Sequence, residues 1–225
     1  MQKSTKYYSN NVSLLGWGAD SRLDRERIKL LKIFVTGKKI LDVGCGLGFY
    51  VDFLNSIGYE CVGVDFVEEF IKEAKRVKKG VFIKAKADDL PFRDNEFDTV
   101  ILFDILEHGD DIKILKEAKR VCKSKILVII PRKVDYQLEQ SGVIFRHYID
   151  RSHIREYEDQ DIKDLAQKTS LKLISLKKIH PLYNETIFLS LFGGSEYLKK
   201  ILRKITFFIL PKITYPTEYF AVFEK

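Results

Sequence analysis

Short apolar runs alternate with amphipathic segments between Lys39 and Ile130. Runs rich in β-branched residues predict five buried strands, at 39–43, 60–64, 80–85, 98–103 and 125–130. Between the second and third runs, and again between the fourth and fifth, apolar residues recur at helical spacing and leave lysines on the opposite side. This alternation is typical of a parallel sheet covered by helices on both faces. It predicts an α/β fold with a doubly wound, mostly parallel sheet.

The pattern extends on both sides of this region. An N-terminal helix is predicted to begin at Asp20 or Ser21, because Ser21 and Asp24 have the spacing of a capping box. Three more elements are predicted towards the C-terminus: a helix at 159–168 and strands at 171–176 and 218–224. The segment between these two strands, 185–217, is too long for a hairpin connection.

Composition narrows the class of protein. The chain has 225 residues, of which 45% are hydrophobic, so it can bury a sizeable core. It has no uninterrupted apolar stretch of the roughly 18 residues that a spanning helix needs, and its N-terminus lacks the apolar core of a signal peptide. We therefore expect a cytoplasmic protein. The three cysteines are far apart and form no CxxC pair, which favours neither a zinc site nor disulfides.

Charge leaves two interpretations open. The chain carries 39 basic and 32 acidic residues, a net charge of +7. Such a balance can indicate nucleic acid or an anionic membrane surface, or simply helices covered by lysine. The basic residues are spread over several segments and are not interleaved with aromatic residues, so nucleic acid is the less favoured partner.

A glycine-rich turn follows the first predicted strand. Gly44, Gly46 and Gly48 lie between this strand and a helical segment, where glycine lets the backbone turn sharply and approach a ligand closely. Asp65 ends the second strand, and its carboxylate can accept hydrogen bonds from both hydroxyls of an adenosine ribose. No lysine follows the glycines as in a P-loop, and Phe49 stands where a dinucleotide fingerprint has its third glycine. The turn therefore does not predict phosphate binding.

Four motifs together resemble those of class I S-adenosylmethionine-dependent methyltransferases. In order they are LDVGCGLG (41–48), VGVDF (62–66), ADDLPF (87–92) and FDTVILFDILEH (97–108). The resemblance covers roughly residues 37–180. It implies a Rossmann-like, seven-stranded sheet and an enzyme that uses S-adenosylmethionine and releases S-adenosylhomocysteine. The likeness is to members of the family that act on small molecules, quinones or glycans.

The resemblance also implies where the cofactor binds. The glycine loop would lie against its methionine part, Asp65 would bind the ribose, and Phe66 would lie beside the adenine. Family members often have an aspartate where this chain has Lys86, so the adenine contact is expected from Asp88 or from the backbone at Ala87. The expected cofactor-binding residues are Asp42, Gly44, Gly46, Gly48, Asp65, Phe66, Ala87, Asp88 and Phe103.

Three histidines are candidates for the chemistry. Methyl transfer needs mainly alignment, and a base is required only when the acceptor is a hydroxyl or a protonated amine. His108 follows the fourth strand, and His147 and His153 lie in a stretch that borders the acceptor in similar enzymes. A purely structural role is the alternative for each. No trio of metal ligands is evident in the sequence, and the pair His147 and His153 with Asp150 is weak, so we expect no metal.

The resemblance and the pattern together predict one methyltransferase domain over 1–225. Its expected parts are a lid and helix at 1–36, a cofactor-binding core at 37–180, an insertion at 185–217 and the last strand at 218–225. Residues 197–217 contain five basic residues and no acid. A basic amphipathic helix suits an anionic membrane surface, although the same face could cap the acceptor pocket or form a homodimer contact.

These observations support a leading function and two alternatives. The leading one is methyl transfer to an oxygen of a small-molecule or lipid-linked acceptor, with peripheral membrane contact in the lipid-linked case. The first alternative is an RNA methyltransferase, which the positive charge motivates, although no appended RNA-binding module is visible. The second is a catalytically silent, cofactor-binding partner subunit. The glycine loop and Asp65 argue against it.

Overall fold

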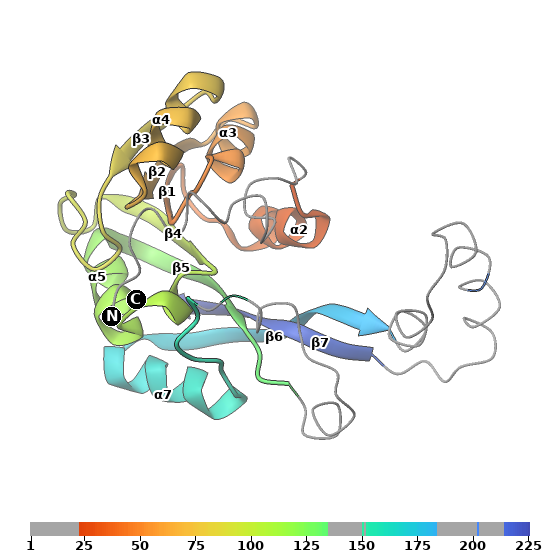
Figure 1. Cartoon of the computed structure of the whole chain (residues 1–225). Helices are drawn as coiled ribbons and strands as arrows, with labels where there is room; N and C mark the ends of the chain where they lie inside the picture. Colours follow the sequence, from red (N-terminus) through yellow and green to blue (C-terminus); the bar gives the residue numbers. More distant parts are fainter. Residues whose placement is uncertain (1–22, 135–149, 151, 184–201, 203–213) are drawn as a thin grey trace.

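The computed structural model describes residues 23–134, 150, 152–183, 202 and 214–225, and these form a seven-stranded sheet with helices on both faces (Figure 1). The strand order is β3-β2-β1-β4-β5-β7-β6. Strand β7 runs antiparallel to both β5 and β6, whereas the other neighbouring strands pair in parallel. The prediction of a doubly wound, mostly parallel sheet is confirmed.

The elements follow the predicted hydrophobic pattern closely. The strands are β1 (Lys39–Val43), β2 (Glu60–Asp65), β3 (Val81–Lys84), β4 (Phe97–Phe103), β5 (Cys122–Pro131), β6 (Lys172–Tyr183) and β7 (Thr214–Glu224). The helices are α2 (Arg25–Phe34), α3 (Phe49–Ser56), α4 (Glu68–Val77), the 3-10 turn η1 (Leu106–His108), α5 (Asp111–Val121) and α7 (Asp159–Thr169).

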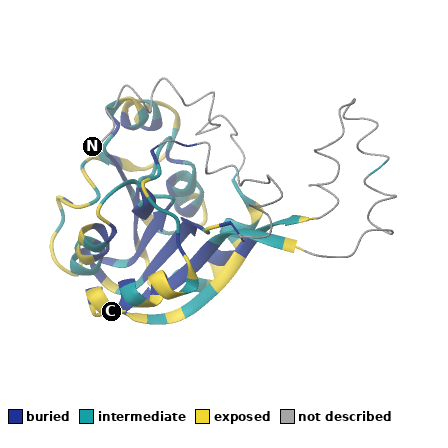
Figure 2. Cartoon of the chain, turned by 60° about the horizontal axis from the view of Figure 1, so that its bottom comes forward, coloured by how far each residue is buried: buried dark blue, intermediate teal, exposed yellow. Residues whose placement is uncertain are grey.

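Alternating side chains of the central strands build two separate cores. On β4, Val100 and Leu102 face α5 and α7, whereas Ile101 and Phe103 face α2, α3 and α4. The central strands are therefore buried on both sides, and Figure 2 shows them in dark blue, with exposed residues on the outer helices and along the edge strand β6. Burial on both faces explains why the central strands read as continuous apolar runs.

The first described helix begins later than predicted. Asp24 is the N-cap of α2, and its side chain accepts a hydrogen bond from the amide of Arg27 at 2.7 Å. The expected start at Asp20 or Ser21 is wrong for this helix, because Leu23 and Asp24 precede it in non-helical conformation. The predicted lid in residues 1–22 lies outside the described residues.

The last two strands are longer than their predicted cores. They pair with each other from Lys172 and Glu224 out to Tyr183 and Thr214. Residues 214–217, which the sequence pattern placed in the insertion, therefore belong to β7. Residues 185–201 and 203–213 of that insertion lie outside the described part, so its predicted roles stay predictions.

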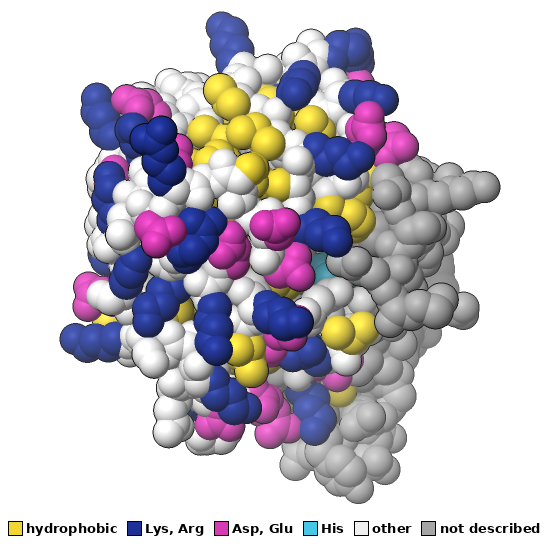
Figure 3. All heavy atoms as spheres, turned by 90° about the vertical axis from the view of Figure 1, so that its left-hand side faces the viewer, with side chains coloured by type: hydrophobic (Ala, Val, Ile, Leu, Met, Phe, Trp, Pro, Cys, Tyr) yellow, Lys and Arg dark blue, Asp and Glu magenta, His cyan; other side chains and the backbone are white. Residues whose placement is uncertain are grey.

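Positive and negative side chains are mixed on one face of the molecule. In Figure 3, lysine and arginine side chains are interspersed with aspartate and glutamate on the face shown. Several charged side chains of the molecule form ion pairs, such as Lys84 with Glu68 at 2.8 Å and Arg76 with Glu73 at 2.7 Å. This face matches the expectation of lysine-covered helices. Within the described ranges, no helix is both long enough and apolar enough to cross a bilayer.

Candidate functional site

The carboxyl ends of three neighbouring strands meet at one edge of the sheet. Strands β2, β1 and β4 are adjacent and parallel, so their ends lie side by side. The glycine loop leaves β1 at this edge, Asp65 is the last residue of β2, and Phe103 is the last of β4. Ligands of open α/β sheets bind outside this edge. The fold thus gathers residues that the sequence singled out separately.

The glycine loop is tied to the end of β2. The amides of Gly44 and Cys45 donate to the carbonyl oxygen of Val64 at 2.7 and 2.9 Å. The amide of Gly46 donates to Oδ2 of Asp65 at 2.9 Å. The loop expected at the methionine part of the cofactor and the acid expected at its ribose are therefore in direct contact.

Two glycines of the loop, Gly46 and Gly48, have different roles. Both have a left-handed backbone, with φ of 52° at Gly46 and 76° at Gly48. A Cβ at Gly48 would lie 2.4 Å from the ring of the buried Phe82, so this position must be glycine for packing. A Cβ at Gly46 would meet no atom of the described residues within 4 Å. Gly46 therefore borders open space into which a ligand can fit.

Asp65 is buried but keeps capacity to bind more donors. Its side chain accepts from the amides of Gly46 and Val67, one at each carboxylate oxygen, at 2.9 and 2.8 Å. A carboxylate has about four lone-pair sites, so each oxygen can accept a further bond from a ribose hydroxyl. Burial raises the pKa of Asp65, and the hydrogen bonds from these amides partly oppose that rise.

Asp42 is a buried acid at the same edge. It is 3% exposed, and its Oδ2 has no hydrogen-bond partner among the described residues. Burial, with a smaller contribution from the nearby charge of Asp65, raises the pKa of Asp42 to about 7. A buried polar atom without a partner carries a free-energy cost. A donor group of a bound ligand would remove that cost.

The remaining predicted cofactor residues lie around the same edge. The amide of Ala85 donates to the carbonyl oxygen of Asp65 at 3.1 Å, which places the chain leading to Ala87 and Asp88 beside β2. Asp88 is exposed, and Phe66 and Ala87 are half-buried. Phe103 instead packs into the core on the α2 and α3 side, with the ring of Tyr50 at a centroid distance of 5.7 Å. Their contacts with the cofactor stay predictions.

An ion network lies at the carboxyl end of β4. The sequence analysis did not predict it. The guanidinium of Arg27 on α2 donates to both oxygens of Asp104, at 2.6 and 3.1 Å, and to Glu218 on β7 at 3.1 Å. Asp104 directly follows β4 and has a left-handed φ of 57°. The Arg27 side chain is 14% exposed. The network joins Arg27 on α2 to Asp104 and Glu218, which are 77 and 191 positions further along the sequence.

His180 extends this network. Its Nδ1 lies 2.6 Å from Oε2 of Glu218, and its Nε2 lies 3.0 Å from Oδ1 of Asp24. Burial lowers the pKa of His180, but the hydrogen bonds and charges of these two acids outweigh that effect and raise the pKa to about 9. The imidazolium form, with two N–H donors, fits both partners. The fourth histidine of the chain is thus structural.

Two of the three candidate catalytic histidines lie together. The rings of His108 and His153 are in edge-to-face contact, with centroids 4.7 Å apart. Burial, with a smaller effect of His153, lowers the pKa of His108 to about 4, so His108 is neutral near pH 7. Such a weakly basic imidazole is not matched to general-base catalysis at neutral pH. His147 lies outside the described residues.

Acidic and hydroxyl groups surround this histidine pair. Nδ1 of His108 lies 3.0 Å from Oγ of Ser152, which donates to Oδ1 of Asp150 at 2.6 Å. Glu107, beside His108 in η1, is 1% exposed, and burial raises the pKa of its carboxyl well above the usual value. A carboxylate oxygen of Glu107 and one ring nitrogen each of His108 and His153 all lie within 4.8 Å of one another. The sequence pattern did not pair Glu107 with His153, which belongs to a distant segment.

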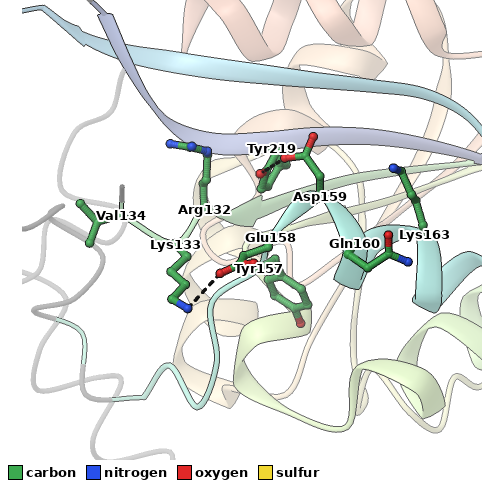
Figure 4. Close-up of a pocket in the computed structure, with 9 residues that line it drawn as sticks. All are labelled: Arg132, Lys133, Val134, Tyr157, Glu158, Asp159, Gln160, Lys163 and Tyr219. Atoms are coloured by element: carbon green, nitrogen blue, oxygen red, sulfur yellow. Dashed lines mark hydrogen bonds and ion pairs between the residues drawn. The ribbon is translucent and has the colours of Figure 1, made fainter. Parts of the chain in front are cut away.

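A polar cavity of about 460 Å³ lies beyond the end of β5 (Figure 4). Its wall includes the ion pair of Lys133 with Glu158, at 2.9 Å, and Tyr219, which donates to Asp159. The lining residues are Arg132, Lys133, Val134, Tyr157, Glu158, Asp159, Gln160, Lys163 and Tyr219. This lining includes none of the predicted cofactor or catalytic residues that the structure describes.

Known proteins are similar to the part of the chain that carries this site. The family described as "Methyltransferase domain" matches residues 41–130, which hold the glycine loop and most of the span from β1 to β5. The chain is 28% identical over 176 residues to an uncharacterized protein of Methanocaldococcus jannaschii, covering 77% of each chain. It is 32% identical to a demethylmenaquinone methyltransferase of Thermotoga maritima, over 60% of this chain and 61% of that one.

Solved structures show the same fold. An S-adenosylmethionine-dependent methyltransferase from Archaeoglobus fulgidus aligns with a TM-score of 0.66 at 20% identity, covering 95% of this chain and 100% of the other. The family match falls on the segment that carries the glycine loop and Asp65. The residues there fit a cofactor of this kind, because Gly46 borders open space and Asp42 has a buried oxygen without a partner among the described residues. The chain thus resembles the class I S-adenosylmethionine-dependent methyltransferases in fold, and the match to the family's domain spans residues 41–130.

Proposed function

We propose that this methyltransferase modifies an oxygen atom of a small-molecule or lipid-linked acceptor. The observation that carries the proposal is the cradle formed by the glycine loop and Asp65, with open space at Gly46. The relative from Thermotoga maritima is named for demethylmenaquinone, and a quinone fits the proposed acceptor class. That relative is matched over 61% of its length, and it supports the acceptor class without identifying the acceptor.

The chain's own residues bind the cofactor and orient it. Asp65 accepts hydrogen bonds from the ribose hydroxyls, and the backbone at Gly46 allows close approach of the cofactor's methionine part. The carboxyl of Asp42 gains a donor partner. When bound, S-adenosylmethionine supplies a methyl group on a positively charged sulfur, which is already an activated leaving group. Alignment by the loop and Asp65 then contributes most of the rate, because proximity and orientation lower the barrier by several kcal/mol.

An acceptor hydroxyl also has to lose its proton. The cluster of Glu107, His108 and His153 follows β4 at the same edge of the sheet as the cradle. Ile105, two residues before Glu107, packs on the glycine loop, since a Cβ at Gly44 would fall 1.8 Å from its Cδ1. A polar cluster so near the cofactor loop supports an acceptor that loses a proton, and an oxygen acceptor meets this condition.

Cofactor binding is tested by replacing the ribose acid. Asp65→Ala should weaken S-adenosylmethionine binding about tenfold to a hundredfold, because a hydrogen bond to a charged group contributes roughly 1.5–3 kcal/mol. Isothermal titration calorimetry of wild type and variant measures this change. Asp164→Ala, on the remote helix α7, is the matched control and should bind like wild type. Equal affinity of wild type and Asp65→Ala would overturn the assignment.

The acceptor class is tested by transfer of a labelled methyl group. Purified protein and labelled S-adenosylmethionine are incubated with a cell lysate, which is then separated into lipid, RNA and small-solute fractions. The proposal expects label in the lipid or small-solute fraction. Label in RNA would replace it with the RNA methyltransferase alternative, and no label with intact cofactor binding would favour the silent partner subunit. Resistance of the methylated product to mild acid and base, as expected of an ether, tests the oxygen assignment against an ester or an onium product.

A further inference from the structure

We propose that Glu107, His108 and His153 bind a divalent transition-metal ion at the carboxyl end of β4. Each of the three residues offers one ligand atom, and these atoms lie within 4.8 Å of one another. They come from two parts of the chain, the 3-10 turn η1 and the segment that precedes α7. The sequence-based expectation of no metal depended on the lack of an evident trio of ligands at the strand ends. The fold assembles such a trio.

Glu107 is the observation that points to a cation. Its side chain is 1% exposed, and neither carboxylate oxygen has a hydrogen-bond partner among the described residues. Burying a carboxylate without a partner is costly, and buried charges in proteins are paired or coordinate metals. A bound cation would give both oxygens a partner at once.

His108 is held in the orientation of a metal ligand. The hydroxyl of Ser152 donates to Asp150 at 2.6 Å, so its oxygen is an acceptor toward Nδ1 of His108 at 3.0 Å. The proton of the neutral imidazole is thereby placed on Nδ1, and the lone pair is placed on Nε2. Metal-binding histidines almost always donate their other N–H to a carboxylate, a carbonyl or water. Here Ser152 relays that interaction to a carboxylate.

His153 completes the set from the segment that precedes α7. Its Nε2 lies 3.9 Å from Oε1 of Glu107 and 3.5 Å from Oδ2 of Asp150. Ligand atoms about 2.0–2.2 Å from one ion are separated from each other by roughly 3–3.5 Å. The 3.9 Å separation is close to this distance, and every pair of ligand atoms lies within 4.8 Å, so side-chain shifts of about 1–1.5 Å would close the site. Asp150 is near enough to be a further ligand or to orient His153.

The donor set selects the kind of ion. Two imidazoles and one carboxylate suit Zn²⁺, Fe²⁺ or Co²⁺, whereas Mg²⁺ and Ca²⁺ prefer oxygen ligands. Three protein ligands leave at least one coordination position for water or another molecule, as in catalytic rather than structural sites. The ion would also face no competing thiolate, because the described cysteines, Cys45, Cys61 and Cys122, are not in this cluster.

The role of the ion rests on the proposed function. An acceptor hydroxyl that binds at the open position gives up its proton to solvent more readily, because the cation stabilises the resulting oxyanion. The oxygen then forms a bond to the methyl carbon as the bond from that carbon to sulfur breaks, and S-adenosylhomocysteine leaves. This role suits the weak basicity of His108, which is a poor base but offers a lone pair. It also explains why a polar cluster lies so near the glycine loop.

Cobalt is the probe that tests the site apart from catalysis. Full-length protein is freed of metal with a chelator, dialysed and titrated with Co²⁺, with neither cofactor nor acceptor present. Visible absorption reports coordination by nitrogen and oxygen, and the expected result is one saturable site per chain. Glu107→Gln and His153→Gln should each lower the affinity at least ~100-fold, because each removes one of three ligands. Ser152→Ala should lower it about 10–100-fold, the usual effect of losing a group that orients a ligand.

His180→Gln is the matched control. It removes a histidine from the network with Glu218 and Asp24, which shares no residue with the proposed site, so cobalt affinity should stay at the wild-type value. Far-UV circular dichroism verifies that each variant is folded, and Glu107→Gln keeps the shape of the buried side chain. Absence of a saturable one-to-one site in wild type would overturn the proposal. So would folded Glu107→Gln and His153→Gln variants that bind cobalt as tightly as His180→Gln.

Calorimetry with S-adenosylmethionine on the same samples separates the two proposals. Normal cofactor binding without cobalt binding refutes the metal site and leaves the proposed function intact. Cobalt binding without cofactor binding refutes the proposed function and leaves the metal site intact. The variants of Glu107 and His153 should keep wild-type affinity for the cofactor, because neither side chain is hydrogen-bonded to the loop or to Asp65 in the described part of the structure.

Discussion

Alanine at two neighbouring glycines should separate cofactor binding from folding. At Gly46 a Cβ meets no atom of the described residues within 4 Å, so the cost to this part of the fold is that of the left-handed backbone, with φ of 52°. That conformation costs an L-residue roughly 1–2 kcal/mol. The open space beside Gly46 is where we expect the cofactor. Gly46→Ala should therefore lower the free energy of unfolding only slightly and weaken S-adenosylmethionine binding at least ~10-fold, as a Cβ enters the cradle.

Gly48→Ala should instead change the stability of the fold more than the affinity for the cofactor. Its Cβ would lie 2.4 Å from Cε1 and 2.7 Å from Cζ of Phe82, and 3.3 Å from Cβ of Ala74. Phe82 is 2% exposed, so its ring has little room to move. Overpacking of a core costs about 1–3 kcal/mol, and the backbone strain adds roughly 1–2 kcal/mol. The total loss in the free energy of unfolding is therefore about 2–5 kcal/mol.

Urea unfolding and calorimetry measure the two effects. The unfolding midpoints give the change in stability when the slopes of the two transitions agree. Titration with S-adenosylmethionine at a temperature where both variants are folded gives the change in affinity. The reasoning fails if Gly46→Ala binds the cofactor like wild type, or if it is destabilised more than Gly48→Ala. The first result would mean that the cofactor does not occupy the space at Gly46, and the second that this space is not open in the fold.

Two further predictions concern pH. The pKa of His180 is raised from 6.5 to about 9, so its contribution to stability is fully present below pH 6.5 and is lost as the pH rises through 9. This contribution is roughly 3 kcal/mol, at about 1.4 kcal/mol per pKa unit. Urea unfolding from about pH 6 to 10 should show this loss in wild type and not in His180→Gln. Asp42 has a pKa raised from 3.8 to about 7, so the cofactor-free protein should lose stability as the pH rises from about 4 through 7. Asp42→Asn should flatten that decline, by up to about 4 kcal/mol, and an unchanged slope would show that the carboxyl of Asp42 is not the cause.

Residues that follow a strand directly could be predicted from the sequence. Gly44, Gly46 and Asp65 are at the ends of β1 and β2, two parallel neighbours, so their convergence follows from local pattern and strand direction alone. The continuous apolar runs also indicated that the central strands are buried on both faces, because helices cover both sides of a parallel sheet. Fold class and the cofactor edge were therefore within reach of sequence reasoning.

The lengths of the last two strands were decided by pairing. The sequence pattern ended the first at 176 and began the second at 218, so that Pro181 and Pro216 lay outside the predicted strands. In the structure β6 and β7 pair beyond those prolines, which lie opposite each other in the ladder. The two strands supply each other's partners along this extension, and an isolated pattern carries no information about such a partner.

Contacts between distant segments were decided only by the tertiary structure. Arg27 reaches Asp104 and Glu218 because α2 packs near the ends of β4 and β7, and no sequence signal joins those three positions. Likewise, Glu107 and His108 meet His153 only after the chain has passed through α5 and β5. Periodicity determines which face of an element is buried, but the strand order and the helix packing determine which polar groups share an edge. The cradle for the cofactor was thus determined by local sequence, and the ion network and the proposed metal site by the fold.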